Sequence, residues 1–138
     1  MAQYLLMESF AGFDDFLIYL GISAALMLIF VAVYVRITPY REFALIREGN
    51  VAAACSLSGT IIGMVLPLSS AITHSVNLVD LAVWGTIALL VQLIVFIVAR
   101  IALPNIVHDI PAGKLASGIF LGAISIAAGL LNAAAMTY

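Results

Sequence analysis

Hydroxyl-bearing and small residues recur at helical spacing along one apolar segment, and they are the strongest chemical signal in the chain. The residues on this face are Ser56, Thr60, Gly63, Pro67, Ser70 and His74. Pro67 has no amide hydrogen, so it leaves the carbonyl of Gly63 without its usual helical donor and favours a kink. Two interpretations stay open. Either the hydroxyls bond to backbone carbonyls and the kink is structural, or the face lines a path for water, an ion or a small solute.

A second polar line runs along the last apolar segment. Its members are Gly118, Gly122, Ser125, Gly129 and Asn132. Between the two lines in sequence, Gln92 is the one strongly polar side chain in the middle of a bulky apolar segment. Because an amide facing lipid is costly, we expect Gln92 to find a hydrogen-bonding partner across a helix or subunit interface. We interpret it as a structural group rather than as part of a transport path.

The residue sets that perform catalysis or hold metals are missing from the sequence. There is no His/Cys cluster, carboxylate pair, Ser–His–Asp set or phosphate-binding loop, and His74 and His108 are expected at opposite membrane surfaces. The apolar segments contain no Asp, Glu, Lys or Arg, so proton-coupled transport also loses support. We therefore predict a protein that is not an enzyme and that uses no metal or cofactor.

The composition requires a membrane environment for these segments. Of the 138 residues, 65% are hydrophobic and 9% are charged, whereas soluble domains have about 45–50% and about 25%. The same figures exclude a disordered chain, which would be poor in apolar residues. The net charge of −2 offers no basic surface for nucleic acid. The chain is therefore expected to be an integral membrane protein that contacts lipids.

Four stretches are long enough to cross a bilayer, which takes roughly 20 apolar residues of helix. They cover residues 16–35, 51–73, 81–99 and 115–136. Pro39, Pro104 and Pro111 lie between them, where a proline costs no helical hydrogen bond. The predicted fold class is an all-α membrane protein with four transmembrane helices in a single transmembrane domain, residues 1–138.

All positive side chains lie in two short connections, and this bias predicts the orientation. These residues are Arg36, Arg41, Arg47, Arg100 and Lys114. Because basic loops stay in the cytoplasm, both connections are expected there, with the N-terminus and the C-terminus outside, in the periplasm. Tyr34 and Tyr40 are then expected at the cytoplasmic membrane interface.

The two halves of the chain resemble each other at an offset of 64 residues. Arg36 aligns with Arg100 and Gly49 with Gly113 in the two connections, and several apolar residues also match. This predicts two tandem helical hairpins, about 14–73 and about 80–138, inserted in the same direction as a parallel repeat. Under this offset the polar lines of the two halves do not coincide, which argues against a symmetric pore.

Each predicted hairpin pairs a bulky helix with one rich in small residues. Gly59 and Gly63 form a GxxxG pattern in the second span, and Gly118 and Gly122 form another in the fourth. Small residues let membrane helices approach closely, because lipid supplies no hydrophobic drive for association. We expect the second and fourth spans at the centre of the bundle, with the first and third facing lipid.

The first cytoplasmic connection is predicted to contain a short interfacial helix. Thr38 would cap it, with Pro39 at the first helical position. Gly49 would then allow a tight turn, and Asn50 would cap the second span. The connection is either an anchored linker or a docking site for a cytoplasmic partner or for anionic lipid head groups.

Four segments resemble a known family: residues 37–42 (ITPYRE), 48–54 (EGNVAAA), 67–72 (PLSSAI) and 132–138 (NAAAMTY). They are similar to the YjfL-type bacterial inner-membrane proteins, catalogued as domain of unknown function 350, or UPF0719. The resemblance implies a multi-pass protein of the bacterial inner membrane without an assigned activity. It also implies a link to envelope maintenance or stress, with a cytoplasmic, membrane-associated protein of the phage-shock type as partner.

Two functions follow from these observations as hypotheses. The first is a structural or interaction module, homo-oligomeric, that engages a cytoplasmic partner through its basic loops. The alternative is an oligomeric channel or conduit for ions or small polar solutes, lined by the Ser/Thr/Gly face of the second span.

Overall fold

The computed structural model describes residues 1–136, and all of its regular elements are helices. In chain order they are α1 (Ala2–Ser9), α2 (Phe13–Ile37), α3 (Glu42–Arg47), α4 (Val51–His74), α5 (Leu78–Ala102), α6 (Ile106–Asp109) and α7 (Leu115–Ala135). Within these residues, four helical stretches are long and apolar enough to cross a membrane, the first of them combining α1 and α2. Residues 137 and 138, the end of the second predicted repeat, lie outside the described residues.

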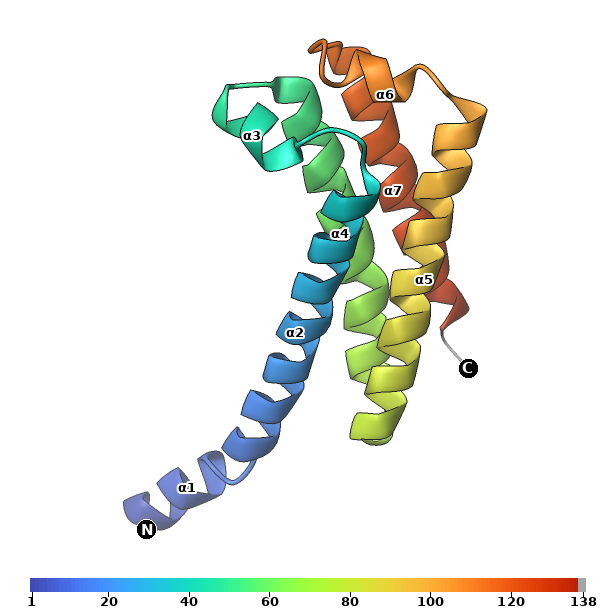
Figure 1. The fold of residues 1–138 in the computed structure, drawn as a ribbon. Coiled ribbons are helices and arrows are strands. Elements are labelled where there is room, and N and C mark those ends of the chain that lie inside the picture. The colour runs from blue at the N-terminus through green and yellow to red at the C-terminus, as the bar shows by residue number, and fades with distance from the viewer. Residues whose placement is uncertain (137–138) are drawn as a thin grey trace.

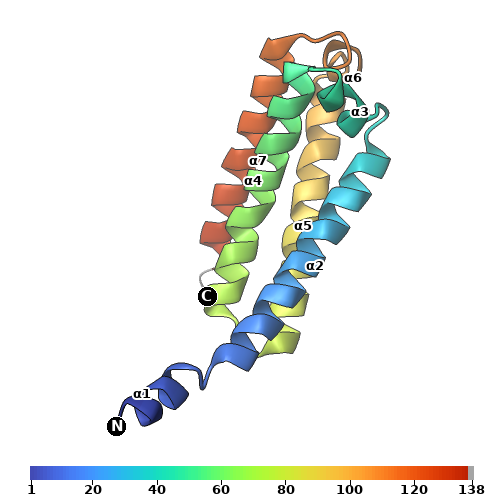
Figure 2. The same cartoon turned by 90° about the vertical axis from the view of Figure 1, so that its left-hand side faces the viewer.

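The four predicted spans correspond to α2, α4, α5 and α7, which confirms the all-α membrane fold. The structure extends the first and third spans by a few residues at each end, to Phe13–Ile37 and Leu78–Ala102. Helix α1 was not predicted from the sequence. It buries none of its residues and turns away from the bundle (Figure 2).

The long helices run side by side, and the short ones lie together at one end. Figure 1 shows α3 and α6 at the end that we call the loop end, with the start of α2 at the other. Helix α4 contacts α2, α3, α5 and α7. In both views α7 lies along α4, so these two helices form the closest pair in the bundle.

Only one of the two helices rich in small residues lies at the centre. Within the apolar stretch of each helix, 56% of the residues are buried in α4, compared with 39% in α5 and 28% in α7. The glycines of α7 lie on the face that meets α4, and the opposite face exposes Ile119, Phe120, Leu130 and Leu131. The expected central position is therefore corrected for α7, which lies at an edge. The bulky helix α5 takes part in the core instead, through Gly85, Ala88 and Gln92.

The first connection differs from the sequence prediction at its start. Helix α3 begins at Glu42, not at Pro39, and Thr38 ends α2 rather than capping α3. The Thr38 hydroxyl donates to the carbonyl of Val35 at 2.9 Å. Thr38 itself is extended, with φ −66° and ψ 133°, as expected for a residue before a proline. The chain therefore leaves α2 sharply and returns as α3.

Both connections close with the same local geometry. Gly49 has φ +85° and Gly113 has φ +79°, a left-handed conformation that glycine adopts without steric cost. Next to them, the backbone amide of Asn50 donates to the carbonyl of Leu45, and the backbone amide of Lys114 donates to the carbonyl of Asp109, both at 2.9 Å. The turn predicted at Gly49 is confirmed.

Candidate functional site

Backbone-to-backbone contact joins α4 and α7 along a line of glycines. A Cβ added to Gly59 would collide with the Cα of Gly122, and one added to Gly129 would collide with the carbonyl oxygen of Gly63. A Cβ on Gly118 would meet the backbone of Ala52 in the same way. Backbone atoms cannot rotate away as a side chain can, so any larger residue would have to push the helices apart. We call this contact the glycine seam.

The seam contains a polar junction centred on Gln92 of α5. Its Nε2 donates to the carbonyl of Gly63 in α4 and, at 3.3 Å, to the carbonyl of Ser125 in α7. Gly63 lies four residues before Pro67, so its carbonyl lacks the usual helical donor. The hydrogen-bonding partner predicted for Gln92 is therefore the acceptor that Pro67 leaves open, and it lies within the same chain. One amide thus connects three helices.

The polar face of α4 points into the protein. Ser56, Thr60, Gly63 and Pro67 are buried. The Thr60 hydroxyl donates to the carbonyl of Ser56 at 2.9 Å and lies 3.4 Å from the Ser125 hydroxyl. Helices α5 and α7 of the same chain contact this face at Thr60 and Gly63, and Ser56 lies near Tyr34 and Tyr40. The face is therefore not free to meet its counterpart in another copy. The arrangement favours the structural interpretation over a conduit.

The remaining residues of the two polar lines lie nearer the end opposite the loop end. The Ser70 hydroxyl donates to the carbonyl of Ala133 in α7 at 3.1 Å, which continues the contact between α4 and α7. Asn132 is half-buried, and its Nδ2 has no hydrogen-bonding partner among the described residues. These positions support packing and do not join the Gln92 junction.

At the loop end, Asn50 connects the two halves of the chain. Its Oδ1 accepts from the amide of Ala53 at 3.0 Å, which confirms the predicted cap of α4. Its Nδ2 donates to the carbonyl of Ile110 at 2.9 Å, in the other connection. Around this bridge Arg36, Arg41 and Arg47 are exposed, Arg100 is half-buried, and the Lys114 side chain is 67% exposed.

The bridge makes a testable prediction. Asn50→Ala removes both a helix cap and the bond between the connections, and it should lower the free energy of unfolding by about 1–2 kcal/mol. Lys114→Ala is the matched control, because Lys114 precedes α7 as Asn50 precedes α4 but makes no side-chain cap bond. Thermal unfolding in detergent measures both variants. Equal effects would contradict a special role for Asn50.

A buried carboxyl group near the loop end was missed by the sequence analysis. The side chain of Glu42 is fully buried, and neither of its oxygens has a hydrogen-bonding partner within residues 1–136. The hydroxyls of Tyr34, Tyr40 and Ser56 are also buried without partners there. Burial raises the pKa of Glu42 to about 8, and burial, with the nearby Glu42 carboxylate, also raises the pKa of Tyr40.

Glu42 was overlooked because it lies in a charged loop, where a glutamate is normally solvated. One signal in the sequence could have identified it. At the offset of 64 residues Glu42 aligns with Ile106, and an apolar residue at the matching position suggests a buried site. Tyr34 and Tyr40, expected at the membrane interface, are covered by the same packing.

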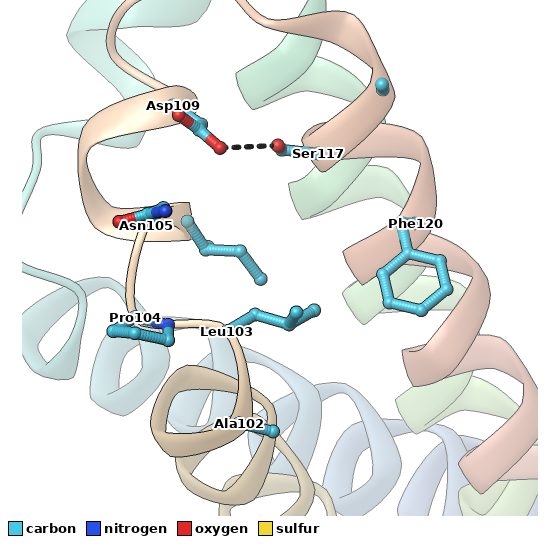
Figure 3. A pocket seen from close by; sticks show the side chains of 9 residues that line it. Ala102, Leu103, Pro104, Asn105, Asp109, Ser117 and Phe120 are labelled. Carbon is cyan, nitrogen blue, oxygen red and sulfur yellow. Dashed lines mark hydrogen bonds between the residues drawn. The ribbon is translucent and has the colours of Figure 1, made fainter.

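An open hollow of about 630 Å³ lies between α7 and the connection that joins α5 to α6. Its walls are mostly apolar, with Leu103 and Phe120 on opposite sides (Figure 3). At its rim the Ser117 hydroxyl donates to Asp109 at 2.9 Å, and Lys114 forms an ion pair with Asp109 at 3.3 Å. The Ser117 bond, supported by Lys114, lowers the pKa of Asp109. Among the described residues, no group of three or more His, Cys, Asp or Glu could hold a metal ion.

Comparisons with known proteins identify one family and two relatives. The family described as Domain of Unknown Function (DUF350) matches residues 6–136. The chain is 42% identical over 120 residues to "UPF0719 inner membrane protein YjfL" of Escherichia coli strain K12. The aligned segment covers 87% of this chain and 91% of the relative. The protein of the same name from Escherichia coli O157:H7 is equally similar. No solved structure matches the chain.

Proposed function

The chain belongs to the DUF350 family, and from this premise we propose that it is a non-enzymatic interaction module of the bacterial inner membrane. In this role the helical bundle anchors a basic platform that engages a cytoplasmic, membrane-associated partner of the phage-shock type during envelope maintenance or stress. Neither the family nor its relatives carry an enzymatic name.

The observation that carries this proposal is the bond between the two connections. Asn50 Nδ2 donates to Ile110 across 60 residues of sequence, so α3 and α6 are held as one surface. Exposed arginines lie on that surface. Beneath it, α4 and α7 pack tightly against each other. A preformed basic surface loses little entropy on binding, which favours a partner with an acidic face.

The proposed orientation places this platform in the cytoplasm and both termini in the periplasm. Support comes from the charge bias of the sequence, since basic connections stay inside. The proposal also includes a parallel repeat. It is supported by the starts of α3 and α6 and of α4 and α7, which are 64 residues apart in each case, and by the matching positive φ of Gly49 and Gly113.

The chain is also proposed to form homo-oligomers through its outer helices. Helix α7 exposes a row of large apolar side chains on the face opposite the glycine seam, including Ile119, Phe120 and Leu131. In this proposal one copy contacts the next through such faces, and the basic platforms of several copies then lie side by side. Several platforms would bind one extended partner more tightly than a single platform.

A pull-down from native membranes tests the proposal. We expect the wild-type chain to retain a cytoplasmic membrane-associated protein that the Arg41→Ala/Arg47→Ala variant loses. Glu48→Ala is the control, because Glu48 is exposed in the same connection but does not contribute positive charge. Partner lists that are the same for all three chains would count against the interaction role. Chemical crosslinking of the same membranes measures the oligomeric state.

A further inference from the structure

Unpartnered oxygen atoms from several segments gather beside Glu42. Within the described residues they are Oη of Tyr34, Oη of Tyr40, Oγ of Ser56 and both carboxylate oxygens of Glu42. The Glu42 carboxylate and the Ser56 hydroxyl lie near both tyrosine hydroxyls, and the Thr38 hydroxyl lies near Glu42. We call the four side chains with unpartnered oxygens the Glu42 cluster. They come from α2, from the connection after it, from α3 and from α4, so the fold brings them together.

No cation from residues 1–136 neutralises this carboxylate. Arg100 is close enough to act on Tyr40, but the described residues contain a single ion pair, between Lys114 and Asp109. A buried carboxylate without a partner is strongly destabilising, and proteins normally neutralise it with a counter-charge or a proton. Glu42 therefore requires either a proton or a bound cation.

The second half of the chain shows that the fold does not need a carboxyl group here. At the offset of 64 residues, Ile106 occupies the position of Glu42 and is likewise buried, with 4% of its surface exposed. The positions that match Tyr34, Tyr40 and Ser56 hold Val98, Pro104 and Phe120, none of which has a hydroxyl. Among these matching positions only Ile106 is buried, since Val98, Pro104 and Phe120 are exposed. The polar cluster is therefore confined to the first half.

We propose that the Glu42 cluster binds one monovalent alkali cation, with the carboxylate as its charged ligand and the hydroxyl oxygens of Tyr34, Tyr40 and Ser56 as neutral ligands. Hard cations prefer oxygen ligands of this kind. The cluster holds a single carboxylate, so one positive charge balances it, whereas protein sites for Ca²⁺ usually combine several carboxylates. This proposal is independent of the platform and its partner.

Thermal unfolding of the purified full-length protein tests the site. The melting temperature is measured in NaCl, in KCl and in choline chloride at equal ionic strength, at a pH above the Glu42 pKa of about 8. Choline is too large for a buried site. A small cation that binds only the folded protein should raise the melting temperature by about 3–6 °C when it reaches about ten times its Kd.

Two variants make the result specific. Glu42→Gln keeps the shape of the side chain without its charge, and Glu42→Ile copies the residue found at position 106. Both should melt above the wild type in choline and should not respond to Na⁺ or K⁺. A second readout is ²³Na NMR. The ²³Na line should broaden in the presence of the wild-type protein and not in the presence of Glu42→Ile.

Three outcomes would overturn the proposal. The first is an equal response of the variants and the wild type to the small cations, which would indicate a general salt effect. The second is a wild type that melts at the same temperature in NaCl, KCl and choline, since the ionised Glu42 would then bind no small cation. The third is ²³Na line broadening that is as large with Glu42→Ile as with the wild type, which would place the cation elsewhere.

Discussion

Gly59→Ala should lower the free energy of unfolding by about 1–3 kcal/mol, although it adds a single carbon atom. The new Cβ would overlap the Cα of Gly122, and the carbonyl of that residue would also lie too close, at 2.7 Å. Neither backbone group can move without shifting α7 as a whole. Since the seam is the closest contact between any two of the described helices, separating it should weaken the entire bundle.

The chain supplies a matched control for this substitution. Gly21 lies in α2, and a methyl group added there would meet no neighbouring atom within 4 Å, so Gly21→Ala removes a glycine from a long helix without a collision. It should be neutral or stabilising by up to ~1 kcal/mol through helix propensity. Reversible unfolding in mixed micelles measures both variants. If they behaved alike, close contact at the seam would not determine stability.

Gln92→Leu should destabilise the protein by about 1–3 kcal/mol, because it leaves a buried carbonyl without any donor. In most membrane helices, losing an interhelical side-chain hydrogen bond costs little stability. The backbone carbonyl that accepted it still has its own helical hydrogen bond. Gly63 lacks that bond because of Pro67. Its carbonyl accepts from Gln92, and it faces an apolar interior when Gln92 is removed.

A double-mutant cycle with Pro67→Ala isolates this cause. An alanine at position 67 restores the backbone amide, which can then donate to the carbonyl of Gly63. Gln92→Leu should therefore cost less in the Pro67→Ala background than in the wild type, with a coupling of about 0.5–3 kcal/mol. The unfolding free energies of the wild type, the two single variants and the double variant give this coupling energy directly. Additive effects would mean that Gln92 stabilises the bundle for a reason unrelated to the proline.

The two halves of the chain differ in what they contribute. The first half holds the Glu42 cluster and the exposed arginines around α3, whereas the second half has Ile106, Phe120 and an open apolar hollow at the matching place. The bond from Asn50 to Ile110 joins them. In the proposed arrangement, the first hairpin carries the specialised chemistry and the second supports it.

The four long helices of this protein follow from its sequence, because they depend on local properties. Apolar length located α2, α4, α5 and α7 to within a few residues, and the polar character of Gln92 in lipid required a partner. The cap at Asn50 and the turn at Gly49 follow from the chemistry of those residues alone. Each of these features is set within one or two turns of chain.

The tertiary structure decided which neighbour covers each face. Periodicity placed Ser56, Thr60 and Gly63 on one side of a helix but did not say which other elements of the chain would bury them. The same holds for α7, whose Gly118, Gly122 and Gly129 meet the backbone of α4. Glu42 is the clearest case, since its burial depends on α2 and α4 closing over a loop residue. Such contacts join distant segments, and no local pattern of residues encodes them.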